Sequence, residues 1–129
     1  MLRACRLAEA DIANIAEEIE SMGRSEKREL VSRLAILLAH LVKWQFQPML
    51  RGTIWRLTIE EQRQRLADHL ADNPSLKATL AESIEAGYRL ALIVAARESG
   101  LSRDTFPPSC PWSFEQMVAD DFWPGGGTE

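Results

Sequence analysis

The feature that most constrains the fold is residues 25–46, which have the pattern of a helix with apolar side chains on most of its circumference. One stripe follows helical periodicity, and a second set of residues widens it. The stripe is Leu30, Leu34, Leu37, Leu41 and Trp44, and the widening residues are Val31, Leu38 and Val42. Pro48 ends this helix, because proline lacks an amide donor and clashes with the preceding turn. A helix of this kind is buried on several sides, so we expect other helices to pack around it.

A shorter helix is predicted before this segment. Apolar side chains recur at residues 12, 15, 19 and 22, which places them on one helical face, and Gly23 is a natural stop signal. On the same helical wheel Glu17 points away from the apolar face, whereas Glu18 and Glu20 lie about 100° from its centre on opposite flanks. The three carboxylates therefore do not converge, and only Glu18 and Glu20 are placed to meet another helix.

Two further helices are predicted after the loop at Pro48. The third covers about residues 53–73 and the fourth about residues 74–99. Asn73 is the expected N-cap of the fourth helix, and Gly100 is its expected C-terminal cap. Gly87 falls on the inner face of the fourth helix, where a glycine costs about 1 kcal/mol relative to alanine. We therefore expect a neighbouring helix to approach closely at Gly87.

The C-terminal region differs in kind from the helical segments. Residues 106–112 contain three prolines and cannot form a helix. Ser113 and Gln116 have the spacing of a capping box, which predicts one short extra helix. The region carries five aromatic residues, too many for a disordered tail: Phe106, Trp112, Phe114, Phe122 and Trp123. We expect an ordered strap that lies over the bundle and seals one side of its core.

These signals together predict an all-α fold: a four-helix bundle with an aromatic, proline-rich C-terminal strap and one short extra helix. A chain of 129 residues has the length of one domain and can bury a sizeable core. We expect residues 1–124 to form a single helical domain and residues 125–129 to be a flexible C-terminus.

Charge is unevenly distributed behind the net charge of -4. Residues 24–65 carry nine basic and four acidic side chains, whereas residues 1–23 carry two and five, and residues 66–129 carry four and ten. The simplest expectation is that the basic middle packs beside the acidic ends. The alternative is a basic face for an acidic partner or a nucleic acid, and the acidic total argues against a nucleic acid.

A polar stripe flanks the apolar face of residues 25–46. Arg33, His40 and Gln47 recur every seven residues, and Glu29 stands four residues before Arg33. An interhelical network or a pocket would form at such an edge, although a lone histidine there is more often a satisfied core residue than a ligand or base. The candidate polar site is Glu18, Glu20, Arg33, His40, Gln47 and Arg63.

A metal site is only weakly indicated. His40 with Glu18 or Glu20 is the candidate ligand set, because histidine and glutamate side chains hold divalent metals inside helical bundles. The Glu-x-x-His signature is absent, since leucines precede both His40 and His69 by three residues. The chain also lacks the phosphate-binding and catalytic motifs that a sequence can reveal. We expect no cofactor, and catalytic residues are not identified.

The cysteines and the apolar runs indicate the cellular compartment that the protein occupies. Cys5 and Cys110 match no metal or redox spacing and fit reduced thiols in a cytosolic protein. The longest apolar run, residues 34–42, has about half the length that a bilayer requires. We therefore expect a soluble, cytoplasmic protein that does not enter a membrane.

Five blocks of sequence, in order, resemble the bacterial family catalogued as domain of unknown function 29. They read NIAEEIESMGRSEKREL, LLAHLVKWQFQP, IWRLTIEEQRQRL, NPSL and FPPSCPWSFEQMVADDFWP, and the resemblance runs from about Leu2 to Pro124. It implies a compact, helical, soluble bacterial protein and no established activity. The family pattern, as it stands here, includes Glu17, Glu18, Glu20, Gly23, His40, Lys43, Trp44, Gln45, Trp55, Arg63, Cys110, Pro111 and Trp123.

The resemblance also implies a further stretch of chain before Leu2. We expect that stretch to cover apolar surface near Ile12, Ile15 and Ile19.

Three functions follow as hypotheses. The first, which we favour, is a non-enzymatic interaction module that acts through a protein partner or another copy of itself, because the chain is rich in packing signals and poor in chemical ones. The second is a small metal-dependent enzyme that uses His40 with Glu18 or Glu20. The third is a nucleic-acid-associated regulator or a partner in a toxin–antitoxin pair.

Overall fold

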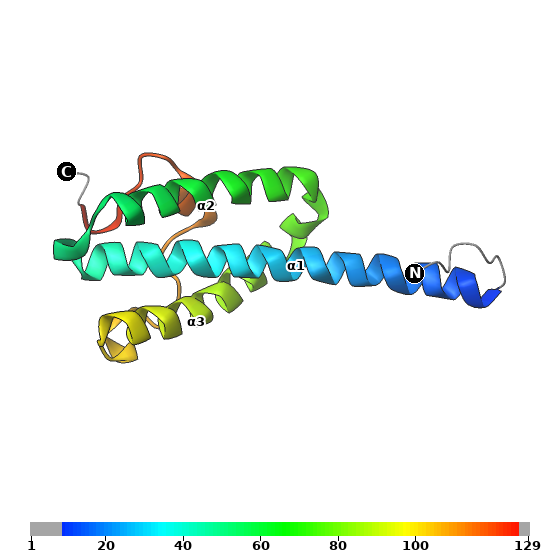
Figure 1. The fold of residues 1–129 in the computed structure, drawn as a ribbon, viewed down its shortest axis with the longest axis horizontal. Helices are drawn as coiled ribbons and strands as arrows, with labels where there is room; N and C mark the ends of the chain where they lie inside the picture. The colour runs from blue at the N-terminus through cyan, green and yellow to red at the C-terminus, as the bar shows by residue number, and fades with distance from the viewer. Residues whose placement is uncertain (1–8, 127–129) are drawn as a thin grey trace.

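The computed structural model describes the backbone of residues 9–126 and the side chains of residues 24–125 (Figure 1). Four α-helices follow one another along the chain: α1 (Glu9–Phe46), α2 (Thr53–Asp72), α3 (Leu80–Ser99) and the short α4 (Phe114–Val118). Short 3-10 turns accompany them: η2 (Pro48–Leu50), η3 (Pro74–Thr79), η4 (Arg103–Thr105) and η5 (Pro124–Gly126).

The prediction of an all-α fold is confirmed, and residues 9–126 contain no β-strand. Helix α1 lies in the middle, with α2 along one side and α3 along another (Figure 1). Two ion pairs, Lys27–Glu82 and Lys43–Glu98, join α1 to α3 with the same offset of 55 residues, so these two helices run parallel. Helix α2 follows the turn at η2 and runs back along α1 in the opposite direction.

The bundle has three long helices, because the first two predicted helices are one continuous helix, α1, of 38 residues. The prediction that Gly23 ends a helix is therefore wrong. A glycine inside a helix costs only about 1 kcal/mol, and the glutamate, methionine, arginine and lysine residues around it are good helix formers. The predicted exposure of Ile12, Ile15 and Ile19 concerns side chains outside those that the structure describes.

The prediction that residues 25–46 form a helix buried on several sides is confirmed. Six apolar residues in this part of α1 have no exposed surface: Leu30, Leu34, Leu37, Leu38, Leu41 and Val42. The same core contains Ile59 and Leu66 of α2 and Ala91 and Ala95 of α3. Full burial of one leucine stabilises a fold by about 1.5–3 kcal/mol, so the central helix makes a large contribution to the core. Among the described residues, no helix has both the length and the apolar content needed to span a bilayer.

Helix α3 comes very close to α1 at Gly87, as predicted. A Cβ atom at this position would lie 2.9 Å from Leu34 Cβ, 3.2 Å from the Ala35 backbone nitrogen and 3.3 Å from the Val31 carbonyl oxygen. The absence of a side chain at Gly87 therefore lets the two parallel helices pack almost backbone to backbone.

The ends of the helices agree with most of the predicted caps. Gly100 ends α3 in the left-handed conformation with a φ of 77°, and Ser113 and Gln116 form the expected capping box of α4. The fourth predicted helix begins as the 3-10 turn η3 before α3 starts. Asn73 marks that boundary, but its side-chain amide donates to the His69 carbonyl oxygen at 3.0 Å instead of capping the next helix.

The C-terminal strap, residues 101–124, leads from the end of α3 over to α2, where α4 lies (Figure 1). Phe106 and Met117 of the strap are buried in the core. The Trp123 ring lies 4.7 Å from the ring of Trp44 on α1. The strap therefore completes the core on one side of the bundle.

Two arginines hold this strap by its backbone. Arg63 of α2, only 3% exposed, donates from Nε to the Met117 carbonyl oxygen at 2.8 Å and from Nη2 to that of Phe122 at 2.5 Å. Arg51 donates from Nε to the Trp44 carbonyl oxygen at 2.7 Å and from Nη2 to that of Pro124 at 3.4 Å. Both guanidinium groups also lie over tryptophan rings, Arg51 over Trp44 and Arg63 over Trp123.

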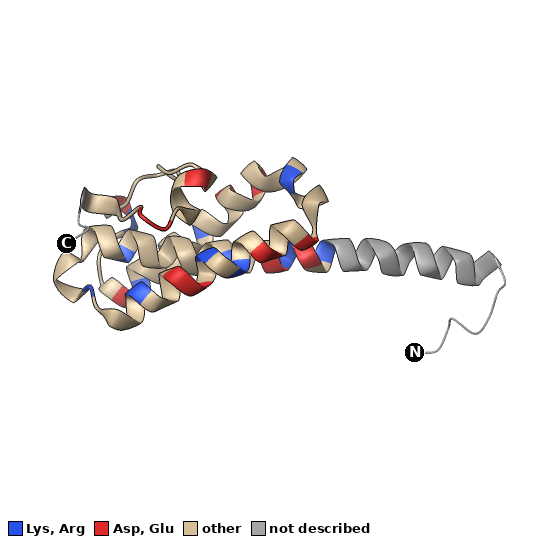
Figure 2. Cartoon of the chain, turned by 90° about the horizontal axis from the view of Figure 1, so that it is seen from above, with Lys and Arg blue, Asp and Glu red and all other residues tan. Residues whose placement is uncertain are grey.

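Basic and acidic residues are interspersed along residues 24–33 of α1 (Figure 2). The Lys27–Glu82 and Lys43–Glu98 pairs join the basic middle of the chain to its acidic C-terminal part. Within the middle segment, Glu29 pairs with Arg33, Glu60 with Arg56 and Glu61 with Arg65. Part of the positive charge of residues 24–65 is thus balanced by the acidic C-terminal part, as expected, and part by glutamates of the same segment.

Candidate functional site

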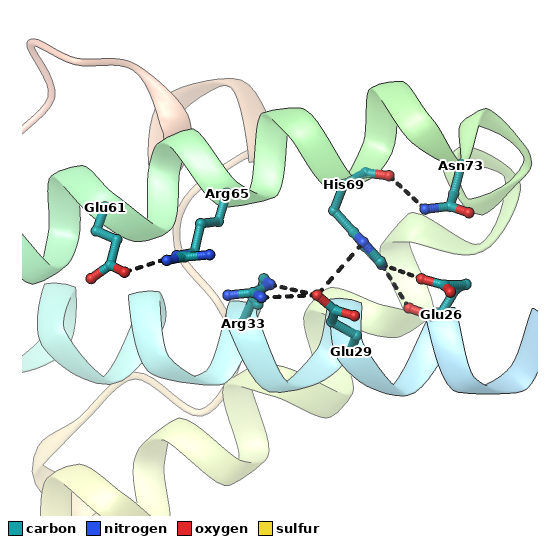
Figure 3. A network of polar contacts seen from close by, with 7 residues as sticks. All are labelled: Glu26, Glu29, Arg33, Glu61, Arg65, His69 and Asn73. Carbon is teal, nitrogen blue, oxygen red and sulfur yellow. Dashed lines mark hydrogen bonds and ion pairs between the residues drawn. The ribbon is translucent and has the colours of Figure 1, made fainter.

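A cluster of one histidine and two glutamates lies between α1 and α2 (Figure 3). Glu26 and Glu29 are three residues apart on α1 and therefore share one helical face. His69 comes from the last turn of α2, which returns to the level of Glu26 because the two helices are antiparallel. The His69 side chain is 8% exposed, whereas those of Glu26 and Glu29 are 39% and 42% exposed. The cluster is a buried imidazole with two carboxylates at its solvent side.

Both ring nitrogens of His69 face oxygen atoms. Nε2 lies 2.9 Å from the Glu26 carbonyl oxygen and 3.6 Å from Glu26 Oε1. Nδ1 lies 3.9 Å from Glu29 Oε2, which is beyond hydrogen-bond distance. One ligand atom from each of the three residues can be chosen so that all lie within 4.8 Å of one another.

These contacts determine where the imidazole carries its hydrogen. A carbonyl oxygen only accepts, so Nε2 is the nitrogen that donates to Glu26. In the neutral ring Nδ1 then has a lone pair, and this lone pair faces a carboxylate oxygen of Glu29. Two acceptors that face each other can be bridged by a proton on Nδ1, by a water molecule or by a bound ion, and Oε2 of Glu29 also accepts from Arg33.

Two arginines border the cluster (Figure 3). Arg33 contacts Oε2 of Glu29 through both Nε and Nη2 at 2.9 Å, and Arg65 contacts Glu61 at 2.8 Å. A small pocket of about 180 Å³ opens beside them, lined by Glu29, Arg33, Arg65, Asp68, His69 and Asp72. The lining is almost entirely charged, so this pocket suits ions rather than apolar ligands.

His40, the histidine emphasised in the sequence analysis, lies in a different place, on the side of α1 that faces α3. It lines a pocket of about 280 Å³ with Lys43 and Glu98 and with small apolar side chains of α1 and α3. Lys43 is 5% exposed, and its Nζ lies 2.5 Å from Glu98 Oε1 and 5.1 Å from the Trp55 ring centre. This arrangement is an ion pair between a buried lysine and a half-exposed glutamate beside an imidazole.

The His40 imidazole is held as a weak base. Nδ1 lies 2.8 Å from the Ile36 carbonyl oxygen and donates to it, which leaves the lone pair on Nε2. Burial lowers the pKa of His40, and the positive charge of Lys43 lowers it further. The hydrogen bond to Ile36 and the carboxylate of Glu98 act in the opposite direction but do not reverse the shift. His40 is therefore neutral at physiological pH.

The lowered pKa of His40 predicts a pH dependence of stability. Because the unfolded chain binds a proton at the ordinary histidine pKa of about 6.5, it gains protons before the folded chain does, and stability falls as the pH falls through that value. We expect His40→Gln to reduce the loss of melting temperature between about pH 7.5 and about pH 5.5. Thermal unfolding of the wild type and of His40→Gln across this pH range measures the effect. An equal loss of melting temperature in the two proteins would contradict the prediction. Glu98, whose pKa is lowered chiefly by its hydrogen bond to Lys43, titrates at lower pH.

The four residues of the predicted polar site whose side chains the structure describes do not converge. Arg33 joins the Glu26–Glu29–His69 cluster, and His40 lies on the α3 side. Gln47 precedes η2 at the end of α1, and Arg63 lies beneath the strap. The side chains of Glu18 and Glu20 lie outside those described.

A ligand pair of His40 with Glu18 or Glu20 within one chain is wrong for this fold. All three residues belong to the single helix α1. Glu20 precedes His40 by twenty residues, or roughly 30 Å at about 1.5 Å per residue, and Glu18 is farther still. The prediction depended on a break at Gly23 that would let two helices fold back on each other, and this break does not exist.

The Glu26–Glu29–His69 cluster was missed by the sequence analysis, although signals for it are present. Glu26 occupies the position between Met22 and Leu30 in the apolar stripe of α1, where a charged residue needs a partner. His69 lies between Leu66 and Leu70 within the apolar face of α2. Because a polar residue at an inward position needs a partner, Glu26 and His69 both indicated a contact between α1 and α2.

Comparison with known proteins identifies a family for this chain. No curated protein and no solved structure matches the chain. A family model described as "Domain of unknown function DUF29" matches residues 1–123 and so includes all three residues of the cluster, His40, and most of the strap. The chain therefore belongs to the DUF29 family, as the resemblance in the sequence indicated.

Proposed function

We propose that this protein is a non-enzymatic helical module that acts by self-association. In this proposal a basic groove on one copy receives the acidic N-terminal part of α1 from a second copy. The observation that carries it is a groove of about 590 Å³ along α1 and α3, lined by Arg24, Lys27, Arg28, Val31, Ser32 and Leu90.

The groove combines positive charge with an apolar floor. Three of its six lining residues are basic, of which Lys27 also pairs with the exposed Glu82 at 3.5 Å, and Val31 and Leu90 provide apolar surface. Leu90 is 47% exposed, and on the same two helices Ile36 and Ile93 are 40% and 45% exposed. Large apolar side chains that gather with a rim of like charge are typical of protein-binding surfaces. Such a groove fits an amphipathic helix with acidic flanks.

The chain itself contains a helix of this chemistry. Residues 9–23 carry five acidic and no basic side chains, and they include the apolar stripe at residues 12, 15, 19 and 22. They directly precede the groove on α1, so two copies with antiparallel α1 helices exchange the same contact twice. Such a two-fold arrangement is the commonest symmetry of oligomers, and the opposite charges set its register.

Nucleic-acid binding by the basic middle segment, residues 24–65, receives less support from the structure. Arg51 and Arg63 bind backbone carbonyl oxygens, and Lys43, Arg33 and Arg65 pair with glutamates. These side chains are therefore engaged within the chain and do not form a continuous surface for a phosphate backbone.

The double variant Lys27→Glu, Arg28→Glu tests the proposal. We expect the wild-type chain to self-associate in a salt-sensitive manner and this variant to be monomeric, because like charges then face each other. A second variant, Glu17→Lys, Glu18→Lys, Glu20→Lys, is expected to be monomeric alone and to form a heterodimer with the first. Light scattering coupled to size-exclusion chromatography measures all three states.

A matched control distinguishes this groove from the other exposed apolar surface, which lies at η2 and the start of α2. Ile54 and Leu57 are 78% and 56% exposed there, three residues apart on one helical face. Ile54→Glu with Leu57→Glu is expected to leave self-association unchanged. A monomeric wild-type chain, or dissociation by this control alone, would refute the proposal.

A further inference from the structure

We propose that Glu26, Glu29 and His69 form a binding site for one first-row divalent metal ion, such as Zn²⁺, which links α1 to α2. This inference does not depend on the proposed self-association, because the three residues come from one chain. It rests on the donor atoms, their separation, the burial of His69 and the charge around it.

The donor set suits such an ion. One imidazole nitrogen and two carboxylate oxygens are ligands that zinc and its first-row neighbours accept, with water in the remaining position. Calcium and magnesium prefer oxygen ligands alone, so the imidazole disfavours them. The site is therefore chemically selective for a borderline divalent cation.

His69 provides the observation that points to a ligand. Its side chain is more than nine-tenths buried, and Nε2 is fixed by the hydrogen bond to the Glu26 carbonyl oxygen. The lone pair on Nδ1 thus points toward Glu29 Oε2, which is 3.9 Å away and accepts hydrogen bonds from Arg33. A hydrogen bond from the other ring nitrogen to a carbonyl is how proteins orient histidines that bind metals.

The donor atoms of the three residues need to move only a short distance to reach the separations found around a bound metal. Tetrahedral ligands at about 2.0–2.2 Å from a metal lie roughly 3.4 Å from one another. One ring nitrogen of His69 and one carboxylate oxygen of each glutamate already lie within 4.8 Å of one another, and Glu26 Oε1, which is 3.6 Å from Nε2, would turn toward Nδ1. Glu26 is 39% exposed and can rotate inward, whereas Glu29, 42% exposed, is held by Arg33 through Oε2, and His69 is held by the Glu26 carbonyl oxygen. Arg33 contacts only Oε2 of Glu29, so Oε1 can turn toward the metal.

The local charge favours a cation. The network and the adjoining pocket contain five carboxylates, from Glu26, Glu29, Glu61, Asp68 and Asp72, and two arginines, Arg33 and Arg65. With a neutral His69 the surroundings are negative, and a divalent ion compensates this charge. A proton on Nδ1 would compensate it less fully, and proton and metal compete for the same lone pair.

Zn²⁺ binding to the full chain, treated first with a chelator, tests the inference. Calorimetry at neutral pH is expected to show one saturable site, and Co²⁺ in its place is expected to give visible absorption bands. His69→Ala should weaken binding by at least about tenfold, the loss that even disturbed second-shell contacts cause. Glu26→Gln, a milder change at a half-exposed position, should weaken it similarly without affecting the fold. Lower pH should weaken binding, because the proton competes for Nδ1.

His40→Ala is the matched control, because it removes the other histidine of the described chain and leaves the cluster intact. It should bind Zn²⁺ as the wild type does. The inference is overturned if the wild type shows no saturable binding, or if His69→Ala and Glu26→Gln retain its affinity. It is equally overturned if nitrogen NMR shows a doubly protonated His69 at neutral pH that Zn²⁺ does not change.

Discussion

Replacing Arg63 by alanine is expected to lower the free energy of unfolding by about 3–5 kcal/mol and to release the C-terminal strap. Two charged hydrogen bonds, to the carbonyl oxygens of Met117 and Phe122, are lost at once. Each bond of this kind contributes about 1.5–3 kcal/mol, and the abandoned acceptors remain partly buried. The cation also leaves the face of Trp123, which removes a further contact.

Chemical denaturation measures the loss, and tryptophan fluorescence reports the strap, because Trp123 packs on Trp44 in the folded chain. Arg56→Ala is the matched control: Arg56 also lies over Trp123, but it is 58% exposed and binds no strap carbonyl. Arg63→Lys should fall between the two, since an ammonium group keeps the charge but cannot reproduce the planar fork. Equal stability of Arg63→Ala and Arg56→Ala would contradict the role given to Arg63.

Gly87→Val is expected to destabilise the fold by about 3 kcal/mol, and Gly87→Ala by about 1–2 kcal/mol. The added atoms collide with Leu34 Cβ and with two backbone atoms of α1. None of these neighbours can rotate away, so α3 must move back from α1 and the core loosens. The gain in helix propensity of about 1 kcal/mol offsets part of the alanine change and none of the steric cost of valine.

Thermal and chemical unfolding check this order. Ala81→Val is the matched control, because residue 81 is exposed on the same helix and has room for the new methyl groups. It should cost only about 0.5 kcal/mol, from the lower helix propensity of valine. Adding Leu34→Ala to Gly87→Ala should not restore stability, since the collision involves the Cβ that alanine keeps. If Leu34→Ala restored the stability that Gly87→Ala removes, α1 and α3 would pack differently from the arrangement described above.

Much of the fold could be predicted because its signals are local. The apolar periodicity of residues 25–46, the capping box at Ser113 and the left-handed cap at Gly100 each depend on a few neighbouring residues. The close approach at Gly87 could be predicted because a glycine on an inner helical face destabilises the helix, and close packing of a neighbouring helix compensates for this cost. These signals carry over from sequence to structure without knowledge of how the helices are arranged.

The continuity of α1 could not be predicted in the same way. Gly23 alone does not distinguish a helix end from a helix interior, because its cost of about 1 kcal/mol is small beside the cooperativity of a long helix. No proline follows it, in contrast to Phe46, which Pro48 follows within two residues. A glycine predicts the end of a helix reliably only when a second signal, such as a following proline, accompanies the glycine.

The candidate site could not be predicted because it depends on register between distant segments. Glu26 and His69 are 43 residues apart, and their contact depends on the length of the η2 turn and on how α2 lies along α1. The residues of the predicted polar stripe were placed correctly along α1, yet Arg33 and His40 ended in two different networks. A helical wheel gives the direction of each side chain but not the helix that it meets.

The way in which Arg51 and Arg63 hold the strap determines where the chain tolerates change. Both arginines bind main-chain oxygens, of Pro124 in one case and of Met117 and Phe122 in the other. Every amino acid supplies such an oxygen, so a substitution at these three strap positions leaves the acceptor in place. The donors have no substitute of the same shape. Random mutagenesis should therefore find that replacements of Arg51 and Arg63 disrupt the strap through lost donors, whereas replacements at the three strap positions act through side-chain packing, above all at the buried Met117.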